Sequence, residues 1–505
     1  MRHINEIKKL IQFPRTQIQL MFQKKTNSKK LFNSKLNIHH STFKTQHSTF
    51  ITQHSKLEVY MFSLIKVFLV ITSTLVVLLT NLSCHRTPVE PEKTKVKLIY
   101  EDALCTEAYF RLKTTEINYP VRVDLYLNKD KVNSFTTFND DTVFVIENLL
   151  PKKSYTSYVR IYPEGGKELV SSEVSFVTMD TTSHDFTWQV FEFGNCGNSV
   201  LFDVAIIDEN NIWAVGEIYM RDSLGRCDPN AYNAVHWDGS KWELKKVSVI
   251  INNIEDTPTI RAICAFNEKD IWFGIASIIR WDGIRYNFVN TSSFFPALIN
   301  KMWGNSSNDL YIVGNNGNIA HWDGRRWTKI ESGTDINLRD IYGNNLSDDI
   351  YIVGNEYSSR LRNVLLRLKN GNVEKLWESY GLEGKEPYGK MIRNIYIKDN
   401  WLFAVGNRYT KENKKLEVKP KSLTNIQFGL INEHKGTDGN DIYTFTAISE
   451  IFHYNGISIE RVFYHPSRKY IFYGGNVKGN IVVGVGSSLG GVYNRPAILV
   501  LGRKN

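Results

Sequence analysis

Residues 310–327 read LYIVGNNGNIAHWDGRRW, and this stretch decides how most of the chain folds. An apolar strand that ends in glycine, Leu310–Gly314, is followed by a second apolar strand that leads into the turn Asp323-Gly324. Asp-Gly between apolar strands indicates a β-hairpin of type I′, because such a turn requires positive φ at its central residues. A tryptophan on either side of the turn can pack across the hairpin. The stretch therefore predicts antiparallel strands.

The same unit recurs through the C-terminal part of the chain, at a spacing of roughly 40 residues in its regular copies. A single four-stranded unit of this length cannot bury both of its faces, whereas units stacked around an axis bury one another. We therefore predict an all-β chain with a seven-bladed β-propeller over residues 186–505. This strand occurs seven times, and six of the copies end in glycine: Ile212–Gly216, Ile271–Gly274, Leu310–Gly314, Ile350–Gly354, Leu402–Gly406, Ile442–Phe445 and Ile481–Gly484.

The last repeat ends at Ala497–Leu501, which is its third strand, and it lacks a fourth. The segment 186–193 precedes the first repeat and reads as an isolated strand that contains Trp188. We expect this segment to supply the missing strand and to close the propeller. The two ends of the domain should then lie side by side.

Two features of the repeat are similar to known propeller families. The Trp-Asp dipeptides resemble those of WD40 propellers, and the Asp-Gly-x-x-Trp turn resembles the Asp-box of sialidase-like propellers. The whole unit is most similar to the IWAVG/HWDGxxW repeats of exported bacterial propeller proteins. This resemblance implies the fold, and it implies no single activity.

Residues 92–180 contain about seven short alternating strands separated by turn-forming residues, which suggests a sandwich. The segment Leu149–Arg160 resembles the corner and the following strand of a fibronectin type III domain, and residues 171–178 resemble its closing strand. The resemblance implies an immunoglobulin-like sandwich in which Tyr155 hydrogen-bonds back to the backbone. An unrelated sandwich of the same class is the alternative. Modules of this kind mostly act as spacers, and we expect that role here.

Residues 61–83 have the pattern of a signal peptide, with a short basic start and an apolar run of about 16 residues. The run ends in Asn81-Leu82-Ser83-Cys84, which resembles a bacterial lipobox. The resemblance implies that Cys84 is lipidated and that residues 84–91 form a linker. An ordinary signal peptide or a single membrane anchor are the alternatives. We expect an exported monomer, lipid-anchored to a bacterial membrane and either periplasmic or on the cell surface.

The basic character of the chain lies almost entirely in its N-terminal residues. Residues 1–60 carry a net charge of +9 out of +10 for the whole chain, and Lys66 carries the remainder. The rest of the chain is neutral overall, which argues against a nucleic-acid partner. We interpret residues 1–60 as a disordered extension ahead of a true start at Met61. A basic arm that binds nucleic acid is the alternative interpretation.

The loops of the predicted propeller are distributed unevenly between its two faces. One face carries short turns, and the other, which we call the long-loop face, carries the insertions 217–233, 248–259, 289–297, 378–390 and 407–424. Variable loops on a rigid scaffold are the usual place for recognition. We therefore expect ligand binding there, with candidate residues Tyr219, Arg221, Tyr232, Phe294, Trp377, Tyr380, Tyr388, Arg408 and Tyr409. The alternative is that these side chains only pack their own loops.

The chain has five cysteines, and no pair has the spacing of a zinc or thioredoxin motif. Cys196 and Cys227 both fall near the long-loop face, so a disulfide between them is plausible in an oxidising compartment. Cys264 lies in an apolar strand and is expected to be a buried free thiol.

No catalytic motif and no cofactor or metal motif stands out in the sequence. The repeated Asp238, Asp282 and Asp323 sit in hairpin turns, where their expected role is backbone geometry. A non-enzymatic binding or scaffolding protein of the cell envelope, which recognises a glycan or a protein, is therefore the leading hypothesis. A carbohydrate-active hydrolase or lyase is the alternative, and it would need two carboxylates facing each other across a cleft.

Overall fold

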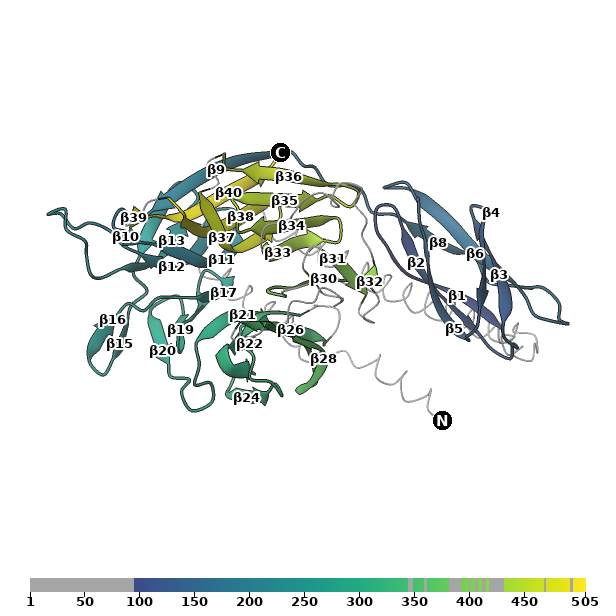
Figure 1. Cartoon of the computed structure of the whole chain (residues 1–505), viewed down its shortest axis with the longest axis horizontal. Coiled ribbons are helices and arrows are strands. Elements are labelled where there is room, and N and C mark those ends of the chain that lie inside the picture. Colours follow the sequence, from purple (N-terminus) through teal and green to yellow (C-terminus); the bar gives the residue numbers. More distant parts are fainter. Residues whose placement is uncertain are drawn as a thin grey trace, which may run out of the picture. The chain divides into compact units, whose positions relative to one another are not determined.

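The computed structural model describes residues 95–343, 348–357, 361–380, 392–398, 401–404, 407–410, 415–416, 431–466, 469–490 and 494–505. The basic extension, the signal peptide, Cys84 and the linker lie outside these residues. Strands dominate the described part, and a 3-10 turn at Asn315–Gly317 is the one helical element within it (Figure 1). None of the described helical segments has the length and apolar character needed to cross a membrane.

The N-terminal strands form two sheets that share one apolar core. Alternating residues of β6 face this core, and Phe110, Val123, Val159 and Ile161 are fully buried in it. The alternation explains the two-sheet arrangement, because a strand with one apolar face must cover it with a second sheet. One sheet has the order β1 (Val96–Ala103), β2 (Ala108–Thr114), β5 (Asp141–Ile146); the other has the order β4 (Asp130–Thr137), β3 (Val121–Leu127), β6 (Ser154–Tyr162), β7 (Leu169–Val170), with β8 (Val174–Val177) also paired to β6.

Tyr155 lies at the start of β6 and connects that strand to the loop before it. Its ring is buried, and its hydroxyl oxygen accepts a hydrogen bond of 2.8 Å from the backbone N–H of Leu150. The bond fixes the corner where the chain passes from one sheet to the other.

The residues from β9 onward form seven four-stranded antiparallel sheets within the described part of the chain, and we number these sheets 1 to 7 along the sequence. In each sheet the first strand in the following list is the innermost one. Sheet 1 is β11 (Val200–Asp208), β12 (Asn211–Ile218), β13 (Tyr232–Trp237), β14 (Trp242–Lys245); sheet 2 is β17 (Ala262–Asn267), β18 (Asp270–Gly274), β19 (Ile278–Trp281), β20 (Tyr286–Val289); sheet 3 is β21 (Ile299–Ser306), β22 (Asp309–Gly314), β23 (Asn318–Trp322), β24 (Trp327–Glu331); sheet 4 is β25 (Leu338–Gly343), β26 (Ile350–Tyr357), β27 (Leu361–Lys369), β28 (Asn372–Tyr380); sheet 5 is β29 (Tyr396–Lys398), β30 (Trp401–Ala404), β31 (Asn407–Thr410), β32 (Lys415–Leu416); sheet 6 is β33 (Ile431–Asp438), β34 (Asp441–Thr446), β35 (Glu450–Tyr454), β36 (Ile459–Tyr464); and sheet 7 is β37 (Tyr470–Lys478), β38 (Ile481–Ser488), β40 (Ala497–Lys504), β9 (Phe186–Phe193).

Each sheet packs against the next one in sequence, and sheet 7 packs against sheet 1. The innermost strands touch in the cyclic order β11, β17, β21, β25, β29, β33, β37 and back to β11. Buried apolar clusters join sheets 1 and 2, 2 and 3, 3 and 4, 4 and 5, 6 and 7, and 7 and 1. Both faces of a sheet are covered in this way, and the all-β, β-propeller-like architecture predicted from the repeats is confirmed.

Strand β9 completes sheet 7 although it precedes sheet 1 in the sequence. It pairs with β40 along its whole length, from Phe186 opposite Lys504 to Phe193 opposite Ala497. Trp188 packs into the cluster between sheets 6 and 7, and its ring centroid lies 5.3 Å from that of Phe463. The pairing places the beginning and the end of this part of the chain next to each other.

The Asp-Gly turns differ from the expected type I′ geometry. In Asp238–Lys241 the carboxylate of Asp238 accepts the backbone N–H groups of Ser240 and Lys241, and φ is positive at Gly239 alone. A positive φ at the first central residue is the pattern of type II′. Asn370 and Gly371, in a two-residue loop, both have positive φ, as type I′ requires. The aspartate replaces part of the turn's backbone hydrogen bonding.

Sheet 6 contains a buried histidine whose charge state affects stability. His434 in β33 is 2% exposed, and its Nδ1 lies 3.0 Å from the hydroxyl of Thr444. Burial lowers the pKa of His434 to about 4, and the neighbouring Lys435 lowers it further while Glu433 opposes the shift. The imidazole therefore stays neutral in the folded chain at pH values where the unfolded chain takes up a proton.

We expect the free energy of unfolding to fall by about 2 kcal/mol between pH 8 and pH 5 through this histidine alone. The folded pKa is below the unfolded one, so the stabilisation is complete above about pH 6.5 and is lost as the pH falls toward 4. Urea denaturation of wild-type and His434→Gln chains at both pH values measures the difference. An unchanged pH dependence in the variant would contradict this assignment, and His321→Gln, at a half-exposed position, is the control.

Candidate functional site

A cavity of about 380 Å³ opens on the axis of the seven sheets and is lined by the beginnings of the innermost strands. Each sheet contributes one residue, which lies in its innermost strand or, for Arg261 and Arg393, shortly before that strand. We call these seven residues the mouth ring: Phe202, Arg261, Asn300, Arg339, Arg393, Asn432 and Tyr473, in the order of sheets 1 to 7.

Irregular strand pairing accompanies most positions of the mouth ring. The register of the innermost strand shifts at Phe202, Asn300, Arg339 and Tyr473. A β-bulge leaves one residue of the strand without a partner and turns it away from the regular alternation. The bulged residue and the residue after it can thus both line the axis, so the cavity has a mouth and a floor.

The floor of the cavity is a network of buried charges that crosses the axis. Lys301 from sheet 3 lies 2.9 Å from the carboxylate of Asp203 in sheet 1 and 3.6 Å from that of Glu433 in sheet 6. Lys435 lies 2.8 Å from the same Glu433 carboxylate. Burial tends to raise the pKa of Glu433, but the two lysines outweigh it and hold the pKa below the usual value. The network fixes the distance between sheets that are not neighbours.

Asp203 and Asp340 also join neighbouring innermost strands. Asp203 accepts the N–H of Ile263 in sheet 2 at 3.1 Å, and Asp340 accepts the N–H of Ile395, next to sheet 5, at 2.9 Å. Burial raises the pKa of Asp340 to about 6, although Lys435 and Lys301 oppose the shift. Both carboxylates therefore act as links between sheets.

The mouth is positively charged. Arg261 and Arg339 form no ion pair within the described residues; Arg261 lies over the ring of Phe202 at 4.4 Å, and Arg339 reaches only the carbonyl of Asn355, at 3.4 Å. Arg393 donates to the side-chain oxygen of Asn432 at 3.0 Å. Burial lowers the pKa of Arg339, and the charge of Arg393 lowers it further. Arg261 and Arg339, which form no ion pair among the described residues, can attract an anion to the mouth.

None of the nine residues predicted on the long-loop face lines this cavity. The side chains of Tyr219 and Arg221 bond within sheet 1 and its β12–β13 loop, to Glu217 and to the carbonyl of Gly225. Lys246 lies over the ring of Tyr232, and Phe294 stacks on Trp327. Trp377 is half-buried beside the cluster of sheets 4 and 5, and Tyr380 is 64% exposed. The side chains of Tyr388, Arg408 and Tyr409 lie outside the described residues.

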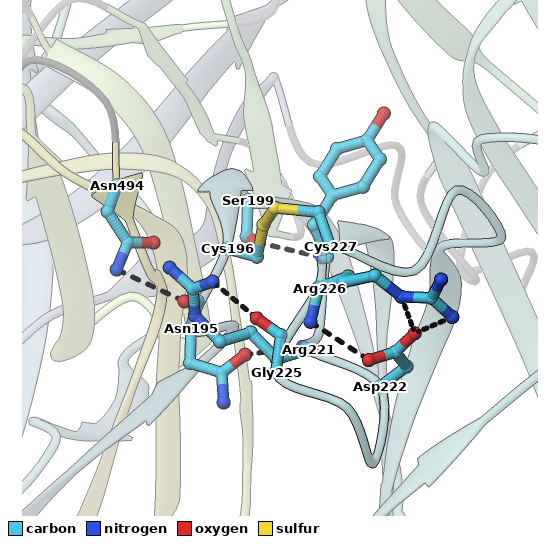
Figure 2. The surroundings of a disulfide bond; sticks show 10 residues. Asn195, Cys196, Ser199, Arg221, Asp222, Gly225, Arg226, Cys227 and Asn494 are labelled. Atoms are coloured by element: carbon cyan, nitrogen blue, oxygen red, sulfur yellow. Dashed lines mark hydrogen bonds and ion pairs between the residues drawn. A yellow bond between two sulfur atoms is a disulfide. The ribbon is translucent and has the colours of Figure 1, made fainter.

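A disulfide joins Cys196 to Cys227, whose Cα atoms lie 5.7 Å apart (Figure 2). Cys196 lies between β9 and β11, and Cys227 lies in the loop between β12 and β13. The bond therefore links the segment that follows β9 to a loop of sheet 1. Within the loop Arg221 donates to Gly225, and Arg226 pairs with Asp222. Asn494 of the β38–β40 connection donates to the carbonyl of Asn195 at 3.3 Å. The seam between sheets 7 and 1 is thus fastened covalently.

The other described cysteines and acids form no group that could hold a metal ion. Cys105 and Cys264 are free thiols, and burial raises the pKa of each to about 12. Across the described ranges no three His, Cys, Asp or Glu side chains are grouped so that they could hold a metal ion.

No family model matches the sequence, and no curated protein matches it. Among solved structures, one described as YCF48 bound to D1 peptide covers 65% of this chain and 100% of its own, with 14% identity and a TM-score of 0.42. A computationally designed protein, Ika8, covers 60% of this chain and 98% of its own, with 12% identity and a TM-score of 0.37.

Removal of the disulfide should destabilise the seam. In the chain-entropy account, a crosslink across 31 residues stabilises a fold by about 3–4 kcal/mol. The Cys196→Ser/Cys227→Ser variant should therefore have a free energy of unfolding lower by about that amount, measured by guanidinium denaturation without reductant. The two proteins should become alike when the wild type is reduced. Equal stability under oxidising conditions would contradict this role of the disulfide.

A separate prediction concerns the network of buried charges at the floor of the cavity. The Lys301→Met substitution leaves Asp203 and Glu433 buried without their shared cation, which should cost about 3–5 kcal/mol of stability. Lys329→Met, at an exposed ion pair with Glu331, should change stability by less than about 0.5 kcal/mol. Thermal denaturation compares the variants, and a small effect at Lys301 would show that the network is dispensable.

Proposed function

We propose that this chain is a non-enzymatic binding protein of a bacterial cell envelope. In this proposal a lipid on Cys84 anchors it, a fibronectin type III module spans residues 92–180, and a closed seven-bladed propeller spans residues 186–505. The Tyr155 corner supports the module, and the pairing of β9 with β40 supports the closure. The leader sequence supports export, and so does the Cys196–Cys227 disulfide, because such bonds persist in oxidising compartments.

One observation carries the proposal: Arg261 and Arg339 face an open cavity and form no ion pair among the described residues, in a chain whose body has no net charge. Partly buried cations that repel one another lower the stability of the fold. Such an arrangement is typical of a site that an anionic partner completes. We assign recognition of a protein or a glycan to the mouth ring and to the loops around it.

The carboxylates beneath the mouth ring are better suited to structure than to catalysis. Asp203 and Glu433 each have a lysine partner, and Asp203 and Asp340 each accept backbone N–H groups from a neighbouring sheet. A catalytic acid must be able to approach the substrate and exchange a proton with it. These groups are held beneath the arginines by contacts that substrate would have to break.

One observation favours hydrolysis as a second candidate function. Asp340 has a pKa raised to about 6, whereas the pKa of Glu433 in the same cavity is lowered. Two carboxylates with pKa values shifted in opposite directions are the arrangement that glycosidases use as acid and base. Release of reducing sugar by the wild type, abolished in Asp340→Asn, would establish this function in place of binding alone.

The binding proposal is tested by comparing the full chain with an Arg261→Gln/Arg339→Gln variant on arrays of glycans and of peptides. Ligands bound by the wild type should bind at least about tenfold more weakly to the variant, because both substitutions remove charge-assisted hydrogen bonds to the ligand. Added salt should weaken wild-type binding as well. The matched control is Arg285→Gln/Arg325→Gln, in the exposed Asp-Gly turns. Equal loss in both variants, or no loss in either, would contradict a role for the mouth ring.

A further inference from the structure

The mouth ring has two unlike sides. Tyr473 and Phe202 come from the neighbouring sheets 7 and 1, and their ring centroids lie 6.1 Å apart. Tyr473 is 42% exposed, so its ring presents an apolar surface to the cavity, and the guanidinium of Arg261 lies over the ring of Phe202 at 4.4 Å. Arg339 and Arg393 come from the neighbouring sheets 4 and 5. In a ring of seven, the point opposite sheet 1 falls between sheets 4 and 5, so the aromatic side faces the cationic side across the axis.

The neutral polar side chains of the cavity are already occupied. Asn300 donates to the carbonyl of Leu338 at 2.8 Å, Asn432 to that of Phe472 at 2.6 Å, and Asn355 to that of Ile392 at 2.7 Å. These amides therefore join neighbouring sheets and have few donors to offer a ligand. A sugar with several hydroxyls needs many such partners, whereas a carboxylate beside an apolar group needs only the cations and the aromatic rings.

The size of the cavity limits what can enter. Its volume of about 380 Å³ is at the lower end of the range of about 300–1,000 Å³ for ligand pockets. The floor is closed by the network of Lys301, Asp203 and Glu433, so a ligand enters from the mouth and ends within the cavity. This favours a short terminal or side-chain group over a continuous chain that passes through the axis.

Building on the function proposed above, we propose that the mouth ring receives a polypeptide carboxylate that is carried next to an apolar side chain. The carboxylate lies against Arg339, with Arg261 contributing long-range attraction, and the apolar group lies against Phe202 and Tyr473. A C-terminal carboxylate and an acidic side chain share this chemistry. Arg339 selects a negative charge, and the rings of Phe202 and Tyr473 select an apolar side chain next to that charge.

The test uses the full chain and three fluorescently labelled hexapeptides of otherwise neutral sequence. The first ends in Leu-Phe with a free carboxylate, the second has the same sequence with an amidated end, and the third is amidated and contains Glu next to Phe. Oligoglucuronate is a fourth probe. Fluorescence anisotropy measures the dissociation constants for the wild type, for Arg339→Gln, for Phe202→Ala and for the control Arg285→Gln. Thermal denaturation confirms that each variant is folded, and Phe202→Leu replaces Phe202→Ala if the latter is not.

We expect the first or the third peptide to bind at least about tenfold more tightly than the second, and the one that does so identifies the source of the carboxylate. Arg339→Gln should remove that preference, Phe202→Ala should weaken binding severalfold, and Arg285→Gln should change neither. Equal binding of all three peptides would overturn this inference. Mouth-dependent binding of oligoglucuronate without peptide binding would overturn it too and leave the proposed binding function intact. Binding of no probe, or binding that no mouth substitution alters, would contradict both this inference and the proposed binding function.

Discussion

Burial of both faces of each sheet is the constraint on which the structure depends. Strands such as Ile212–Ile218 and Ile481–Ser488 are buried along almost their whole length, so neither face of their sheets can meet water. Stacking around an axis satisfies every sheet at once, provided that the last sheet meets the first. The pairing of β9 with β40 and the Cys196–Cys227 disulfide both act at that meeting point. An apolar pattern repeated along the sequence thus leads directly to a cavity on the axis.

The β-propeller-like class could be predicted from the sequence because its signal is local and repeated. Leu310–Gly314 and the Asp323-Gly324 turn each specify a strand or a hairpin without reference to distant residues. Finer geometry could not be predicted in this way. The Asp-Gly turns have positive φ at glycine alone, and in the first of them the aspartate side chain accepts the N–H groups of the two residues after the glycine.

The mouth ring was missed for a physical reason. Its members occupy equivalent places but differ in the chemistry of their side chains. Phe202, Arg339 and Asn432, for example, are aromatic, cationic and neutral polar residues from three sheets. Irregular strand pairing occurs at most of these positions, and a bulge has no reliable sequence pattern. An alignment of the seven innermost strands would have shown that four of them carry a charged residue at the same position, Asp203, Lys301, Asp340 and Glu433. Attention to long loops instead selected Tyr219 and Arg221, whose side chains serve their own loop.

We propose that the mouth ring is a site for an anion beside an aromatic surface. A crystal structure of the full chain grown with 3-phenylpropionate tests it most directly. We expect the carboxylate of the additive to lie against the guanidinium of Arg339, and its phenyl ring to lie against Phe202 and Tyr473. The account would be contradicted if an acidic side chain of this chain occupied the mouth and paired with Arg339 and Arg261.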